Sequence, residues 1–62
     1  MKYNIKHVHY RDKYGVLLWE EPMILKRLWG VGNDLVANYV TYEVLGVAVA
    51  DDVQHVNIGR IE

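Results

Sequence analysis

DLVANYVTYEVLGVAVA, residues 34–50, is the longest run of the chain without a turn signal and the densest in β-branched residues. Its valines and Thr41 favour extended backbone, because two heavy atoms on Cβ restrict the side chain in a helix and pack well on a pleated sheet. The stretch therefore predicts a long strand, bent or interrupted at Gly46. Alternate positions are apolar on both faces, which is typical of a strand covered on both sides by the fold or by a second subunit.

A helix is the competing interpretation of the same stretch. Asn33 or Asp34 would cap a helix that runs to Leu45, and Gly46 would be its left-handed final residue. Strong helix formers are few among these positions and valines are many. We therefore expect a strand.

Shorter strand patterns lie on both sides of this stretch. Alternation is the strand signal in Lys2–Tyr10, and a high content of residues that favour strands is the signal in Val16–Glu20. The connection between them ends at Gly15, which can adopt a positive φ. The pair Asp51-Asp52 predicts a tight polar turn, after which Val53–Ile61 would pair antiparallel with the end of the central stretch.

The segment Pro22–Trp29 is ambiguous. Glu20 and Glu21 precede it, Lys26 and Arg27 lie near its end, and Gly30 would stop it. This order of acid, base and glycine favours a helix of one to two turns, whereas the alternation expected of a strand is poor. We keep a short helix here as one possibility within a β-rich fold.

These elements predict a mainly β protein with a single domain over residues 1–62. The expected architecture is a small antiparallel sheet or barrel of four to five strands, with or without the short helix at Pro22–Trp29. A chain of 62 residues buries only about 60% of its unfolded surface, and its core yields roughly 3–5 kcal/mol. Because there is no cysteine, disulfides and thiolate metal sites are excluded. Oligomerisation is therefore the expected additional source of stability.

Charge is unevenly distributed along the chain. Residues 1–13 hold four Lys or Arg against one Asp, a net of +3, and residues 30–62 hold five carboxylates against Arg60, a net of −4. This asymmetry favours pairing of the first and last strands, within one chain or between subunits. It is a poor match to a nucleic-acid binder, whose affinity comes mainly from many cationic contacts with phosphate.

The composition also argues against catalysis. The chain has no serine and no cysteine, and Thr41 is its only aliphatic hydroxyl, so covalent catalysis of the Ser or Cys type is excluded. Glu20-Glu21 and Asp51-Asp52 are adjacent carboxylates, which point to opposite faces of an extended chain. We therefore expect no enzymatic activity and no cofactor.

Histidines provide the only pattern that resembles a metal site. His7 and His9 would share one face of a strand, and His55 would join them if the first and last strands pair. With no thiolate and no suitably spaced carboxylate, structural histidines and no metal are the expectation.

Cations and aromatic residues gather in the first half of the chain. The mixture suits a protein interface, a phosphate-containing ligand such as a nucleotide held between subunits, or single-stranded nucleic acid; its plain alternative is a hairpin that solubilises an edge strand. The candidate binding residues are His9, Tyr10, Arg11, Lys13, Tyr14, Trp19, Lys26, Arg27 and Trp29.

The seven aromatic residues are all Tyr or Trp, which suit half-wet surfaces and interfaces. On the central stretch we expect Tyr39, Tyr42 and Val44 at an oligomer interface. The function expected first is therefore a non-enzymatic binding protein that acts as a homo-oligomer and engages another protein, as small virus-encoded regulators and inhibitors do. Capture of a small anionic ligand and single-stranded nucleic-acid binding are the alternatives.

No stretch approaches the roughly 18 to 20 apolar residues that span a bilayer. The opening residues Met1-Lys2-Tyr3-Asn4 do not resemble a signal peptide. The expected location is the cytoplasm, with no membrane partner.

Overall fold

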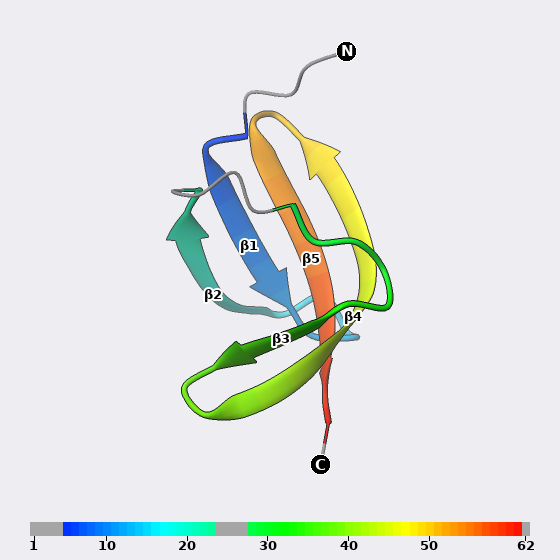
Figure 1. The fold of residues 1–62 in the computed structure, drawn as a ribbon. Helices are drawn as coiled ribbons and strands as arrows, with labels where there is room; N and C mark the ends of the chain where they lie inside the picture. Colours follow the sequence, from blue (N-terminus) through cyan, green and yellow to red (C-terminus); the bar gives the residue numbers. More distant parts are fainter. Residues whose placement is uncertain (1–4, 24–27, 62) are drawn as a thin grey trace.

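The computed structural model describes residues 5–23 and 28–61, which form one curled sheet of five strands (Figure 1). The order across the sheet is β2-β1-β5-β4-β3. The strands are β1 (His7–Arg11), β2 (Leu17–Pro22), β3 (Asp34–Ala37), β4 (Val40–Ala50) and β5 (Val53–Arg60). The prediction of a small, mainly β domain with four to five strands is confirmed.

The first and last strands lie side by side, as the charge asymmetry predicted. β1 and β5 pair in parallel, whereas the β1–β2, β3–β4 and β4–β5 pairs are antiparallel. The sheet is therefore mixed rather than purely antiparallel. Tight turns force antiparallel pairing on sequence neighbours, but β1 and β5 are separated by three strands, and such a long connection permits the parallel arrangement.

The predicted long strand over residues 34–50 is two strands. Asn38 (φ 53°) and Tyr39 (φ 65°) both have positive φ, which defines a type I′ turn that folds β3 back against β4. The chain does not break at Gly46; β4 continues through it with a shift of register between Val44 and Gly46. Asn38, a residue that tolerates left-handed backbone, was the signal for the turn, and the many valines around it masked that signal.

The other turns lie where the sequence placed them. Asp51 (φ 50°) and Asp52 (φ 67°) form a second two-residue turn of the same type between β4 and β5. Gly15 has φ 82° in the β1–β2 connection, and the side chain of Asp12 accepts hydrogen bonds from the backbone N–H groups of Tyr14 and Val16. An aspartate that bonds the backbone two residues later is a common way to close such a loop.

The expected helix at Pro22–Trp29 falls partly outside the described residues. Pro22 ends the edge strand β2, and the N–H of Met23 donates to the carbonyl of Lys6 at 2.9 Å. Residues 24–27 are not described, and residues 28–30 are not helical. No helix occurs in residues 5–23 or 28–61, including none long and apolar enough to cross a membrane.

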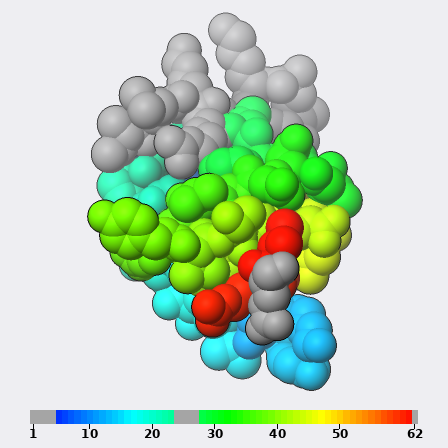
Figure 2. Space-filling view, turned by 60° about the horizontal axis from the view of Figure 1, so that its bottom comes forward, coloured from blue at the N-terminus to red at the C-terminus, as the bar shows by residue number. Residues whose placement is uncertain are grey.

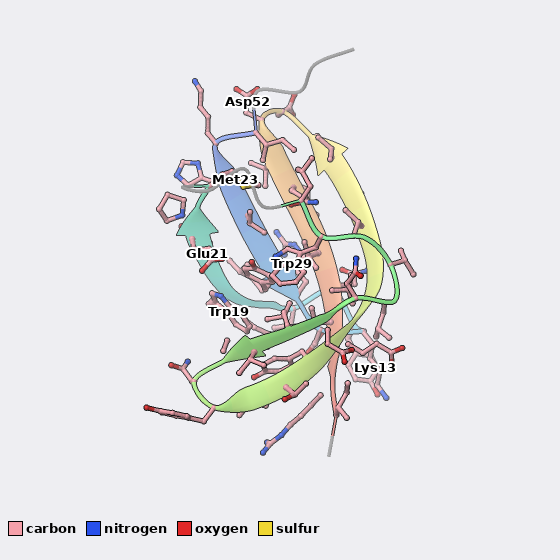
Figure 3. The ribbon with its side chains drawn as sticks, in the orientation of Figure 1. Lys13, Trp19, Glu21, Met23, Trp29 and Asp52 are labelled. Carbon is pink, nitrogen blue, oxygen red and sulfur yellow. The ribbon has the colours of Figure 1, made fainter. Side chains whose placement is uncertain are left out.

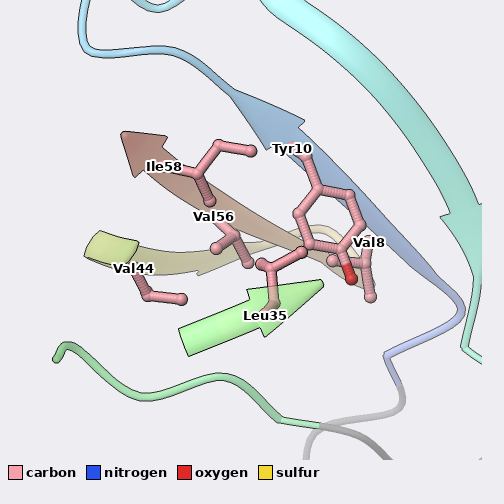
Figure 4. Close-up of a cluster of buried hydrophobic side chains, with 6 residues drawn as sticks. All are labelled: Val8, Tyr10, Leu35, Val44, Val56 and Ile58. Carbon is pink, nitrogen blue, oxygen red and sulfur yellow. The ribbon is translucent and has the colours of Figure 1, made fainter. Parts of the chain in front are cut away.

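The core lies on the concave side of the sheet (Figure 4). Alternate positions of β1 and β5 point into it, and β3 and β4 each add one fully buried side chain. The core residues are Val8, Tyr10, Leu35, Val44, Val56 and Ile58, all at most 5% exposed. The positions between them face outward, so the sheet has a packed inner face and an outer face.

The lower end of the molecule in Figure 1 comes forward in Figure 2. There the β3–β4 hairpin (light green) and the β1–β2 connection (blue to cyan) lie on opposite sides of the end of β5 (red). The two loops therefore present separate surfaces.

Candidate functional site

The nine candidate binding residues do not form one surface. Tyr10, Trp19 and Trp29 belong to the core or pack against it, and His9 lies on the outer face. Arg11 ends β1, and the β1–β2 connection carries Lys13 and Tyr14. Lys26 and Arg27 are outside the described residues. Figure 3 shows the separation: Trp19 and Trp29 lie on the inner side of the sheet, and Lys13 lies at the lower end.

The inner aromatic residues form a hydrogen-bonded and stacked cluster. The hydroxyl of Tyr10 donates to Glu21 Oε1 at 2.7 Å and accepts from Trp29 Nε1 at 2.8 Å. The Tyr10 ring stacks on Trp19 with centroids 4.6 Å apart, and Trp19 contacts Tyr42 at 5.6 Å. Buried tyrosine and tryptophan need a partner for each polar tip. Here Trp29 donates to the Tyr10 hydroxyl, which in turn donates to Glu21. Tyr10 is part of the core, and Trp19 and Trp29 are partly buried against it.

Two polar residues of this interior were not predicted. Glu21 accepts the Tyr10 hydroxyl, and Gln54, 1% exposed, donates from Nε2 to the backbone carbonyl of Trp29 at 3.3 Å. The Oε1 atom of Gln54 is buried without a hydrogen-bond partner. The available signal for Gln54 was its position, since it lies on the same face of β5 as Val56 and Ile58. Apolar patterning alone assigns such a residue to the outside.

On the outer face, three side chains form a row across neighbouring strands. His9 lies opposite Glu20 of β2 and opposite His55 of β5. His9 Nε2 is 2.9 Å from Glu20 Oε2, and the two imidazole rings are 5.4 Å apart and nearly perpendicular. Burial, then the charge of Arg11 and then that of His9, hold the pKa of His55 below its ordinary value. The pairing of the terminal strands thus brings His9 and His55 together, as the sequence suggested.

The histidines do not assemble a metal centre. His7 lies on the same face as His9, but its partners in the adjacent strands are Pro22 and Val53. Within the described ranges, no three His, Asp or Glu side chains are arranged to hold a metal ion.

The β1–β2 connection satisfies most of its own polar groups. Arg11 Nη1 donates to the carbonyl of Gly15 at 3.2 Å, and Lys13 Nζ lies 5.1 Å from the centroid of the Tyr14 ring. Tyr14 is 78% exposed. Among the described members of the predicted cation and aromatic set, Arg11, Lys13 and Tyr14 lie together around this connection.

The three residues expected at an oligomer interface have different environments. Val44 is 1% exposed and points into the core, so its side chain offers no surface to a second subunit. Tyr42 is half-buried against Trp19. Tyr39 is fully exposed, with a relative accessibility of 104%. The physical reason for the difference is that Tyr39 lies in the turn itself, whereas Tyr42 and Val44 lie in β4 at alternate positions that face inward.

Tyr39 is therefore the most conspicuous surface residue. Type I′ turns prefer Asn, Asp and Gly, because a bulky side chain is disfavoured at positive φ. A non-glycine residue in the left-handed region loses roughly 1 kcal/mol or more, and the fully exposed ring of Tyr39 gains no burial within the described chain to offset it. Val36 of the same hairpin is 69% exposed. The β3–β4 hairpin is thus an exposed aromatic element with a local energetic cost.

Comparison of this chain with family models, with curated proteins and with solved structures found no match.

Proposed function

We propose that this chain is a non-enzymatic binding protein that acts as a homo-oligomer and engages another protein through the tip of the β3–β4 hairpin. The observation that carries the proposal is Tyr39, a large aromatic residue that is fully exposed and held at φ 65°. Backbone strain of this kind concentrates at functional sites, where the strained residue performs a task that the fold itself does not need.

Tyrosine suits the proposed role chemically. It provides a large apolar area and a polar tip with only two side-chain torsions to immobilise, so it binds at a low entropic cost. Tyrosine is also enriched among the residues that dominate protein interfaces. A two-residue turn holds the ring at a defined place, which further reduces the ordering needed on binding.

The chemistry of the hairpin indicates what the partner must offer. Asn38 and Tyr39 present neutral polar groups, and Val36 adds aliphatic surface nearby in the sequence. The matching site is an apolar pocket with a hydrogen-bond partner for the phenol, rather than a charged groove. The nucleotide alternative has less support from the described residues, because Trp19 and Trp29 pack against the core and lie away from Lys13 (Figure 3).

The test is a comparison of the proteins retained by three immobilised forms of the chain. Tyr39→Gly removes the ring and leaves a residue that favours the turn, and Asp52→Gly makes the matched backbone change at the other type I′ turn. We expect at least one protein to be retained by the wild type and by Asp52→Gly but lost with Tyr39→Gly. For that protein the Kd should rise about 30-fold, the loss typical of a dominant interface tyrosine.

The same experiment can overturn the proposal. If no retained protein depends on Tyr39, the hairpin tip is not the recognition element. A lower melting temperature of Tyr39→Gly would also contradict the premise that the tyrosine is strained in the free chain.

A further inference from the structure

The outer face of the sheet carries charge in two separated halves. In one row, Arg11 of β1 lies beside Asn57 of β5, which lies beside Gly46 of β4. In the next row, Gly59 of β5 lies beside Glu43 of β4, which lies beside Asp34 of β3. Within these two rows the cation lies on the β1 side of β5 and the two carboxylates lie on its β4 side. Glu20 of β2 is a further carboxylate on the β1 side, where it already has a partner in His9, whose Nε2 is 2.9 Å from Glu20 Oε2.

The carboxylates form an unfavourable pair within the chain. Asp34 and Glu43 are directly opposite each other in the antiparallel β3–β4 ladder, where like charges destabilise the pairing. Neither forms a salt bridge within residues 5–23 and 28–61. Arg11 also has no salt bridge there, and its Nη1 donates to the carbonyl of Gly15. The chain thus holds two uncompensated acids and an uncompensated cation on one face.

Apolar residues accompany both halves. Leu17 and Leu18, at the irregular start of β2, are 42% and 46% exposed beside Arg11. Leu45 is 45% exposed on the β4 side and extends over β5, where its Cδ1 would be 3.2 Å from a Cβ on Gly59. Consecutive exposed leucines and a leucine above the central strand are unusual on a surface that faces only water.

We propose that this outer face binds a second copy of the chain about a two-fold axis near β5, with Arg11 of each subunit opposite Glu43 of the other. A two-fold axis through the uncharged middle of the face superposes the cationic half of one subunit on the acidic half of the other, and it does so twice. Leu45 lies near this axis and buries apolar surface there. The segregated charges favour a second copy over an unrelated protein, because both complementary halves are already present on one chain.

This inference rests on the homo-oligomer of the proposed function and identifies its interface. It differs from the expectation that placed the interface at Tyr39, Tyr42 and Val44. The hairpin tip remains available to another protein, because Tyr39 is not part of the outer-face rows. Binding of a partner and self-association are therefore separable properties.

The test is a charge exchange followed by sedimentation equilibrium. Arg11→Glu and Glu43→Arg should each weaken the dimer by about tenfold or more, and the double variant should recover the wild-type association. Arg60→Glu is the control, since Arg60 is an exposed arginine on β5 that pairs with Tyr42 instead of the outer-face carboxylates. It should leave the mass unchanged.

Glu43→Gln separates association from folding. It removes the repulsion with Asp34, so the monomer should melt at a higher temperature while the dimer dissociates more readily. Misfolding cannot produce that combination. A wild-type chain that remains a monomer at about 200 μM, single reversals that leave the mass unchanged, or a double variant that stays dissociated would each overturn the inference. A wild-type monomer would also overturn the homo-oligomer of the proposed function, whereas the other two outcomes would overturn only this interface. None of them affects the Tyr39-dependent retention of another protein.

Discussion

The turns Asn38-Tyr39 and Asp51-Asp52 have the same backbone and opposite chemistry. Both are two-residue turns with positive φ at each central residue, between 50° and 67°. Aspartate tolerates the left-handed region and suits a solvated turn, whereas tyrosine is disfavoured there. One turn therefore follows from local preference, and the other conflicts with it.

Their positions in the sheet also differ. The backbone carbonyl of Asp52 accepts hydrogen bonds from the N–H groups of Lys6 at 2.7 Å and His7 at 3.4 Å, so this turn helps to attach β1 beside β5. The Asn38-Tyr39 turn closes a hairpin whose outer strand, β3, is at the edge of the sheet. Local preference explains the residues of the aspartate turn, whereas it does not explain Tyr39, which is the reason for proposing a partner contact at that tip.

The largest expected effect comes from placing proline in each turn. Proline cannot adopt a φ near 65°, so both Asp52→Pro and Tyr39→Pro destabilise the chain by more than about 1 kcal/mol. Asp52→Pro disrupts the centre of the sheet and should leave the chain unfolded at 25 °C, since the whole domain has only roughly 3–5 kcal/mol. Tyr39→Pro should remain folded with a lower melting temperature. Circular dichroism and amide exchange at Val56 would distinguish them, and equal loss of structure would refute the contrast between centre and edge.

Glycine in each turn has a smaller effect of the opposite sign. Tyr39→Gly should stabilise the chain by about 1 kcal/mol, which raises the melting temperature by roughly 4–8 °C, because it removes the disfavoured side chain at positive φ. Asp52→Gly should give about half of this gain, since aspartate already tolerates the region. Thermal and urea unfolding of both variants would measure the difference. A larger gain at Asp52 would reverse the ranking on which the comparison depends.

Acid should destabilise β1 and β5, the strands next to the Asp51-Asp52 turn, before it destabilises β3. This is the smallest of the expected effects. The pKa of His55 is held below its ordinary value of about 6.5 by burial, by Arg11 and by His9, so the unfolded chain binds the proton more readily. The stability that neutral His55 contributes is fully present above about pH 6.5 and is lost as the pH falls through and below that value. Amide protection in β1 and β5 should therefore fall before protection in β3.

The control for this prediction is His55→Gln, which should show a weaker dependence of the melting temperature on pH between about 7.5 and 5.5. If the variant and the wild type lose the same stability over that range, His55 is not the responsible group. Such a result would leave the rest of the comparison between the turns unchanged.

Local chemistry predicted much of this fold. The Gly15 connection, the Asp51-Asp52 turn and the strand that follows it were all recognisable from residue type, because glycine and aspartate have strong backbone preferences. The turn at Asn38-Tyr39 was missed, because only Asn38 favours it and the surrounding valines favour an uninterrupted strand. The parallel pairing of β1 with β5 was anticipated only as proximity, since charge asymmetry carries no information on direction.

The candidate sites were less predictable than the strands. Tyr39 was expected at an oligomer interface and is fully exposed, whereas Tyr10, Trp19 and Trp29, expected at a binding surface, form the inner cluster. A half-wet aromatic residue satisfies its polar tip equally well at an interface or within a small core, and composition does not separate the two. The exposure of each ring depends on which face of the curled sheet it joins.

The sequence by itself determined the class of fold and the chemistry available to the chain. β-Branched runs, turn residues and the lack of serine and cysteine are properties of residues and their neighbours, so they can be recognised without coordinates. Only the tertiary structure decided which residues meet. It placed His9 beside His55, directed Val44 inward, and brought Asp34 opposite Glu43. Register and face are set by the packing of distant segments, because a shift of one residue in a strand exchanges its two faces.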